Sequence, residues 1–195
     1  MRRMVMRVAM RGVGLAAILA SGFLRAADAG FASAQQKLDM IEAGRAARGS
    51  SVVFTESEAN AWARGKLAEV APQGVRNLRL SLGAEVVTGA ALVDFLKLRE
   101  AGGQGSSWFW TRMLQGERPV NATIRVVSTS GRATVYLTRV EISNAAATGS
   151  LLDFLIQNFV RTLYPAVKIN QPIELDDPVE RIDVRPGGVR VTMKK

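Results

Sequence analysis

The sequence predicts one α+β domain with antiparallel strands over 51–195, after a short N-terminal leader. Three observations support this fold class. Stretches such as 78–82 and 120–126 alternate apolar and polar residues, which is typical of strands with one apolar face. Other stretches repeat apolar residues every three or four positions, which is typical of helices. The 195 residues are 48% hydrophobic, enough for a core, and no sequence repeat or linker divides the chain.

The N-terminus has the pattern of a secretory signal peptide. Residues 1–12 contain arginines and no acid, residues 13–24 are uncharged, and small residues follow. The apolar run is short for a membrane span, which takes roughly 20 residues. Ala-x-Ala cleavage patterns occur at 27–29 and 32–34, and the second is preferred because an aspartate interrupts the first. We expect a leader at 1–34 and export to the periplasm or cell envelope; an uncleaved N-terminal membrane anchor is the alternative.

Charge and composition exclude several function classes. The formal net charge is +9, but the leader holds five arginines and one aspartate, so the remaining 161 residues carry +5, with acids and bases intermixed. A dedicated nucleic-acid binder is therefore not expected. The chain has no histidine and no cysteine, which removes His-based triads, thiol chemistry, disulfides and metals ligated by those residues. No cofactor and no metal are predicted.

The first part of the exported chain is predicted to be helix, strand and helix. Residues 35–50 form a polar helical lead-in, and Ser51–Phe54 form a strand. Thr55 and Glu58 then match a capping box, in which each side chain bonds the backbone N–H of the other residue. The helix that follows runs over 56–70.

Strands dominate the middle of the sequence. The leucines of 78–82 share one face of a strand. Residues 84–100 are predicted to be a long strand, with a helix over 90–100 as the alternative. The glycine-rich stretch 102–107 is predicted to be a flexible loop.

Two hairpins are expected further along. In the first, which turns at Ser130-Gly131, the apolar phase changes after Leu137. One extra residue would cause this change, so we predict a β-bulge near Thr138-Arg139. The second hairpin pairs 182–184 with 189–193 across a Pro-Gly-Gly turn.

The most apolar helix is predicted over 150–163, capped by Ser150 and ended by Pro165. Its polar residues fall on one narrow side, so it needs cover on most sides. Ordinary core packing is one interpretation, and the periodicity by itself favours it. The other is that helix and sheet leave an apolar groove for an acyl chain.

Three consecutive aromatic residues, Trp108, Phe109 and Trp110, are hard to bury together because neighbouring side chains point in different directions. Arg112 and Arg118 are near enough in sequence to meet lipid phosphates. The segment is either a membrane-facing tip or a plug at one end of the core, and the sequence leaves both open.

The acidic residues give no support for an enzyme. The acids between 174 and 183 lack the spacing and the glycine of a calcium loop. A glycosidase would need two carboxylates facing each other across a cleft, and no acid pair here lacks a simpler role. We therefore expect a non-enzymatic protein.

Several segments carry a family resemblance. The stretch Phe54-Thr-Glu-Ser-Glu-Ala-Asn60-Ala-Trp62 resembles the "f-T-e-x-E-l-N" helix start of small exported envelope proteins related to the tubular lipid-binding (TULIP-like) superfamily. Val93-Asp94, the strand pair around Ser130-Gly131, and the segments 172–175 and 179–191 resemble them too.

This resemblance implies a curved antiparallel sheet wrapped around a long apolar helix. It also implies a non-enzymatic protein that binds or carries lipid or acyl chains in an apolar groove, in the bacterial cell envelope. The expected groove residues are Asn60, Trp62, Leu152, Phe154, Leu155, Phe159 and Leu163. The expected membrane-facing tip is Trp108, Phe109, Trp110 and Arg112. The alternative is an envelope structural or protein-interaction domain with a filled core and no ligand.

Overall fold

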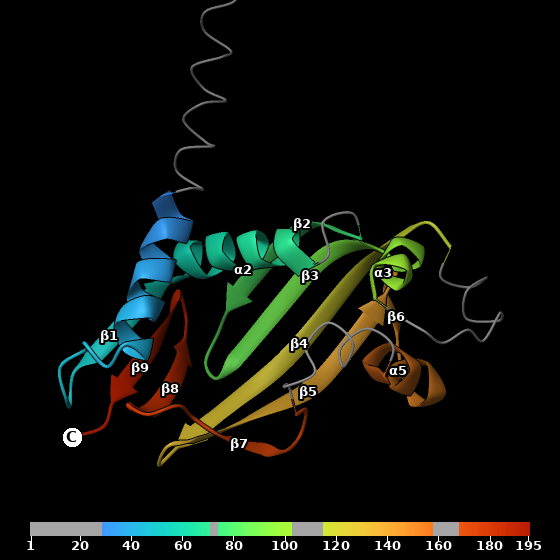
Figure 1. Ribbon diagram of the computed structural model, residues 1–195. Helices are drawn as coiled ribbons and strands as arrows, with labels where there is room; N and C mark the ends of the chain where they lie inside the picture. The colour runs from blue at the N-terminus through green and yellow to red at the C-terminus, as the bar shows by residue number, and fades with distance from the viewer. Residues whose placement is uncertain (1–28, 71–73, 103–114, 158–167) are drawn as a thin grey trace, which may run out of the picture.

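The computed structural model describes residues 29–70, 74–102, 115–157 and 168–195 (Figure 1). Two antiparallel sheets hold more of these residues than the helices do, so the predicted α+β class with antiparallel strands is confirmed. The large sheet has the order β2-β3-β4-β5-β6, and β7 also pairs with β5. Its strands are β2 (Val75–Leu82), β3 (Val86–Asp94), β4 (Glu117–Thr129), β5 (Arg132–Ile142), β6 (Ala145–Ala146) and β7 (Pro172–Glu174).

The small sheet has the order β1-β9-β8, and its outer strand β8 lies beside the large sheet. Its strands are β1 (Ser51–Thr55), β8 (Val179–Arg185) and β9 (Gly188–Met193). The predicted last hairpin is confirmed, because β8 and β9 pair with Val184 opposite Val189. The backbone N–H of Ile182 donates to the Ser128 hydroxyl at 3.0 Å, which ties β8 to β4 of the large sheet.

Four helices occur in the part of the chain that the structure describes. They are residues 29–42, α2 (Glu56–Val70), α3 (Phe95–Gly102) and α5 (Gly149–Leu155). The 29–42 helix covers the small sheet, α2 runs from there along β2, and α3 and α5 lie together at the far end of the large sheet (Figure 1).

Each sheet has its own hydrophobic cluster. The large-sheet cluster is built from Val93, Phe95, Leu98, Ile142, Ala147 and Leu155. The small-sheet cluster is built from Ala34, Ile41, Val52, Phe54, Val179, Val191 and Met193. Helix α2 joins them, because Leu67 packs against the first cluster and Trp62 against the second.

The expectation of a curved sheet wrapped around one long apolar helix is wrong. Helix α5 spans seven residues, Gly149–Leu155, and its one buried residue is Leu155. Two short helices, α3 and α5, pack on the large sheet instead, because Phe95 and Leu98 of α3 share its hydrophobic cluster with Leu155 of α5. The Ser150 cap is also wrong: Thr148 is the N-cap residue, and it makes no side-chain cap hydrogen bond.

The capping box at the start of α2 is confirmed. The backbone N–H of Thr55 donates to the Glu58 carboxylate at 2.8 Å, and the N–H of Glu58 donates to Thr55 Oγ1 at 3.2 Å. The 84–100 stretch divides between its two interpretations, since β3 ends at Asp94 and α3 begins at the next residue. Asp94 Oδ1 accepts the N–H of Leu96 at 3.1 Å, which gives α3 a local start signal.

The β-bulge near Thr138-Arg139 is confirmed. Thr123 pairs with Arg139 and the next residue of β4, Ile124, pairs with Leu137, so Thr138 is the extra residue. The Thr138 hydroxyl donates to the backbone carbonyl of Thr123 at 2.9 Å and closes the bulge. The apolar residues on either side of the bulge therefore share one face of the sheet.

Candidate functional site

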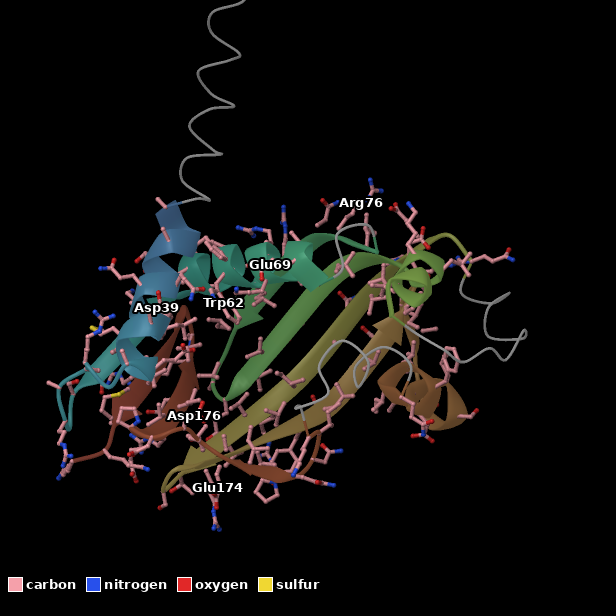
Figure 2. The ribbon with its side chains drawn as sticks, viewed as in Figure 1. Asp39, Trp62, Glu69, Arg76, Glu174 and Asp176 are labelled. Atoms are coloured by element: carbon pink, nitrogen blue, oxygen red, sulfur yellow. The ribbon has the colours of Figure 1, made fainter. Side chains whose placement is uncertain are left out.

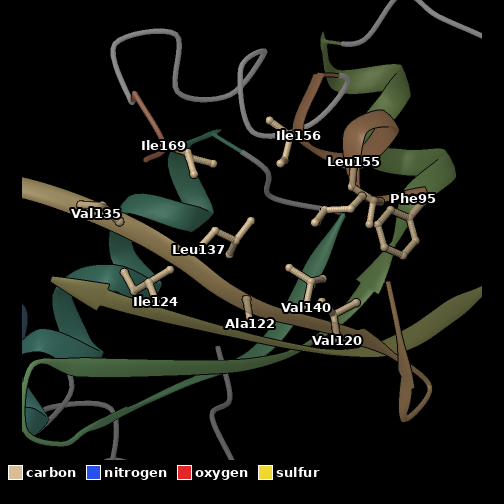
Figure 3. A pocket seen from close by; sticks show the side chains of 11 residues that line it. Phe95, Val120, Ala122, Ile124, Val135, Leu137, Val140, Leu155, Ile156 and Ile169 are labelled. Atoms are coloured by element: carbon tan, nitrogen blue, oxygen red, sulfur yellow. The ribbon is translucent and has the colours of Figure 1, made fainter. Parts of the chain in front are cut away.

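An apolar pocket of about 350 Å³ lies between the large sheet and α5 (Figure 3). Figure 3 shows side chains of β4 and β5 pointing toward α5, with Phe95 at one end. All of its lining residues are apolar: Phe95, Val120, Ala122, Ile124, Val135, Leu137, Val140, Leu152, Leu155, Ile156 and Ile169.

Strand alternation and the bulge build the floor of this pocket. Val120, Ala122 and Ile124 are alternate residues of β4, so they share a face. On β5, Leu137 precedes the bulge and Val140 follows it, and both line the pocket. If β5 continued in regular alternation through Thr138, Val140 would face the other side of the sheet.

The rest of the wall comes from separate parts of the chain. Leu152, Leu155 and Ile156 belong to α5 and the residue after it, and Phe95 begins α3. Ile169 is held beside β5, because the N–H of the following Asn170 donates to the carbonyl of Val135 at 2.8 Å.

Of the predicted groove residues, Leu152 and Leu155 line the pocket. Phe154 is partly buried against the large-sheet cluster and is not among the lining residues. Phe159, Leu163 and the predicted tip (Trp108, Phe109, Trp110 and Arg112) lie outside the described residues. Sequence reasoning missed the floor of the pocket, although the alternation in β4 and the phase change in β5 already marked these residues as one face.

Asn60 lies away from the pocket, at the joint between α2 and β2. Its amide donates to the carbonyl of Leu80 at 2.8 Å and accepts the N–H of Leu80 at 2.7 Å. It thus acts as a substitute strand partner for the free edge of β2. Glu56 also bonds this edge of β2, two residues further along, since its carboxylate accepts the N–H of Leu82 at 2.9 Å.

Trp62 also lies away from the pocket, on α2 near the 29–42 helix (Figure 2). It packs against the small-sheet cluster, and its indole N–H donates to the Gln35 side chain at 3.3 Å. Both polar groups of the recognised motif, at Asn60 and Trp62, are therefore used inside the fold.

Among the described residues, the buried Glu58 carboxylate has a clearly shifted pKa. Lys37 Nζ donates to both of its oxygens at 2.7 Å, and Ser33 Oγ donates at 2.6 Å. Burial by itself raises the pKa of Glu58, but the hydrogen bonds from Lys37, Ser33 and the Thr55 N–H, with the Lys37 charge, lower its pKa to about 2. This ionised group fastens the 29–42 helix to the start of α2.

No side chain that lines the pocket carries a titratable group. The pocket can therefore hold an apolar group through the burial of apolar surface. Within the described ranges, no group of three or more acidic, His or Cys residues is placed to hold a metal ion. In the same ranges, no helix combines the length and the apolarity that crossing a bilayer needs. No family model, curated protein or solved structure matches this chain.

Proposed function

We propose that this protein is an exported, non-enzymatic lipid-binding protein of the bacterial cell envelope that holds one acyl chain in the pocket over β4 and β5. The uninterrupted apolar lining carries this proposal. An acyl chain gains free energy from burial alone, and it needs no hydrogen-bond partner along its length. The signal-peptide pattern of the N-terminus supports the cellular location.

The volume of the pocket suits a chain of moderate length. At about 350 Å³ it lies in the lower part of the range of roughly 300–1,000 Å³ typical of small-molecule sites. If each methylene occupies about 30 Å³, near the share of one water molecule in the liquid, the pocket holds about a dozen methylenes.

A binding free energy follows from that length. Burying a dozen methylenes gains roughly 10 kcal/mol at about 0.8 kcal/mol each. Association costs at least about 4 kcal/mol. The remaining ~6 kcal/mol corresponds to a Kd on the order of tens of micromolar, which suits a carrier that also releases its ligand.

The test is displacement of a fluorescent fatty acid from purified, delipidated full-length protein. The informative variant is Ala122→Phe, because Ala122 is the smallest residue of the lining and a phenyl ring there fills the space. Asn121→Phe is the matched control, since the neighbouring residue of a strand faces the opposite side of the sheet. Thermal unfolding of all three proteins establishes that each is folded.

Binding by the wild type and by Asn121→Phe, with loss in Ala122→Phe, supports the proposal. Native mass spectrometry of protein taken from cell envelopes should also find a co-purifying lipid. A folded wild type that binds no acyl chain, by either method, overturns the proposal in favour of a structural or protein-interaction domain without a ligand.

A further inference from the structure

We propose that export processing cuts this chain between Ala29 and Gly30, so that the mature protein keeps the helix at 30–42; this inference rests on the proposed export. The sequence pattern alone favours the later site, after Ala34. The folded structure favours the earlier one, because the five residues between the two sites make contacts that the domain uses.

Ala34 and Ser33 are the first of these contacts. Ala34 has 1% of its surface exposed and belongs to the small-sheet cluster, together with the equally buried Met193. Ser33 Oγ donates to Glu58 at 2.6 Å, across 25 residues of sequence. A cut after Ala34 would remove a buried methyl group and a hydrogen bond to a buried carboxylate.

Phe31 and Gly30 fit against glycine and alanine positions of α2. A Cβ atom added at Gly65 would lie 2.4 Å from the Phe31 ring, so the glycine makes room for the ring. At Gly30, an added Cβ would lie 3.1 Å from the Cβ of Ala61. The close packing of the two helices therefore extends to residue 30.

The two cuts also place the new α-amino charge differently. After the later cut the ammonium would be on the half-buried Gln35, next to the apolar small-sheet cluster, where a charge loses part of its hydration. The earlier cut places the ammonium at Gly30, next to the exposed Ala29, at the end of the helix. Both sites meet the small-residue requirement of signal cleavage.

The test is N-terminal sequencing and intact mass of the processed product after expression of the full-length chain in a bacterium with a secretory pathway. Ala27→Phe and Ala32→Phe are matched variants, since each puts a large residue three positions before one of the two cuts. Ala32 is exposed, so its replacement leaves the core intact.

We expect a product that begins at Gly30, that is lost in Ala27→Phe, and that forms normally in Ala32→Phe. A product that begins at Gln35 overturns the proposal. A chain that keeps its leader in the wild type also overturns it.

A second inference comes from Arg118 and rests on the proposed function: the geometry points to a ligand with a negatively charged head group. The Nε atom of Arg118 is buried and has no hydrogen-bond partner. Among the described residues, no ion pair joins Arg118 to an acid. A buried N–H donor without a partner is unfavourable unless a ligand supplies an acceptor, and the positive charge of the half-exposed Arg118 side chain favours an anionic acceptor.

Arg118 is placed to meet a ligand that leaves the pocket. It precedes Val120 by two residues on β4, in a stretch of regular pairing with β3, so its Cβ lies on the pocket face of the sheet. Its cross-strand partner Val93 is in the large-sheet cluster beside Phe95, a lining residue. An acyl chain along the floor would thus bring a carboxylate or phosphate head to Arg118.

The test compares dodecanoate with dodecanol, which have the same chain and differ in head-group charge. We expect the wild type to bind dodecanoate at least tenfold more tightly, and Arg118→Met to remove this preference while retaining dodecanol binding. Arg125→Met is the matched control, because Arg125 stacks its guanidinium on Tyr136, 5.1 Å from the ring centroid, on the other face of β4.

Equal binding of both ligands by the wild type overturns the role of Arg118 and leaves the pocket proposal standing. An Arg125→Met variant that loses the preference as fully as Arg118→Met overturns it as well. Failure of the wild type to bind either ligand overturns the proposed function itself.

Discussion

At the residue scale, the polar residues of the T-E-x-E-x-N motif build a joint. Thr55 and Glu58 close the first turn of α2, while Glu56 and Asn60 bond backbone groups of β2. Each of these bonds satisfies a backbone group that a helix start or a strand edge leaves without a partner. The motif therefore fixes how β1, α2 and β2 meet.

Glu58 predicts a specific pH dependence of stability. Its folded pKa of about 2 lies below the ordinary value of 4.5, so its contribution is complete above pH 4.5 and is lost as the pH falls to 2. The shift corresponds to about 3 kcal/mol of unfolding free energy. Glu58→Gln should abolish this component in urea unfolding measured from pH 6 to pH 2; an unchanged profile would contradict the Lys37–Glu58 geometry.

Asn60 predicts a loss of stability without a loss of binding. Asn60→Ala leaves the N–H of Leu80 without its acceptor, which should cost about 1–3 kcal/mol in urea unfolding. Affinity for acyl chains should stay unchanged, because Asn60 is not among the lining residues. Weaker acyl-chain binding by Asn60→Ala at unchanged stability would mean that Asn60 takes part in ligand binding.

At the element scale, one inserted residue sets which side chains of β5 face the pocket, and one helix–helix contact sets how the 29–42 helix packs on α2. The bulge at Thr138 turns Val140 onto the same face as Leu137. The contact between Phe31 and Gly65 sets how closely the 29–42 helix approaches α2. Both features determine which apolar side chains are buried, so changes to either should alter the free energy of unfolding.

Deleting Thr138 should be tolerated far better than inserting a residue beside it. The deletion removes the one residue that the ladder passes over, so Leu137 and Val140 keep their partners on β4. An alanine inserted after Arg139 shifts the pairing by one residue instead, and turns the buried Ile142 toward solvent. We expect the insertion to cost more than about 2 kcal/mol in urea unfolding and to weaken acyl-chain binding. Equal effects of the deletion and the insertion would contradict this account.

Phe31 and Gly65 should be energetically coupled in the exported protein. Without Phe31, Gly65→Ala should stabilise α2 by about 1 kcal/mol, because alanine is the better helix former. With the ring in place, the added methyl meets it and the gain shrinks or reverses. A double-mutant cycle should give a coupling of at least about 0.5 kcal/mol. Zero coupling would mean that the mature chain begins after Phe31.

At the scale of the whole molecule, two sheets with separate clusters share one helix, and the pocket lies on the large sheet alone. Lys37 ties the 29–42 helix to α2 through its ion pair with Glu58 and to β1 through its hydrogen bond to the carbonyl of Val53. The pocket walls come from β4 and β5 on the sheet side and from α3 and α5 on the helix side. A bound chain would thus join the large sheet to two helices that contribute to its hydrophobic cluster.

A bound ligand should therefore stabilise the whole domain. Dodecanoate at a hundred times its Kd should raise the unfolding free energy by about 2.7 kcal/mol. Ala122→Phe should show no such increase, because its pocket is filled. The measurement is urea unfolding with and without the ligand, and stabilisation of both proteins alike would place the ligand elsewhere.

The sequence by itself determined the features whose causes lie within a few residues. The capping box, the alternation of β4, the phase change at Thr138 and the last hairpin are local patterns, and the fold contains each of them. The tertiary structure alone decided the rest. Asn60 meets Leu80 across 20 residues and Ser33 meets Glu58 across 25. The pocket needs side chains from Phe95 to Ile169. Periodicity reports which face of an element is apolar, but the element that covers this face is chosen by packing between distant segments.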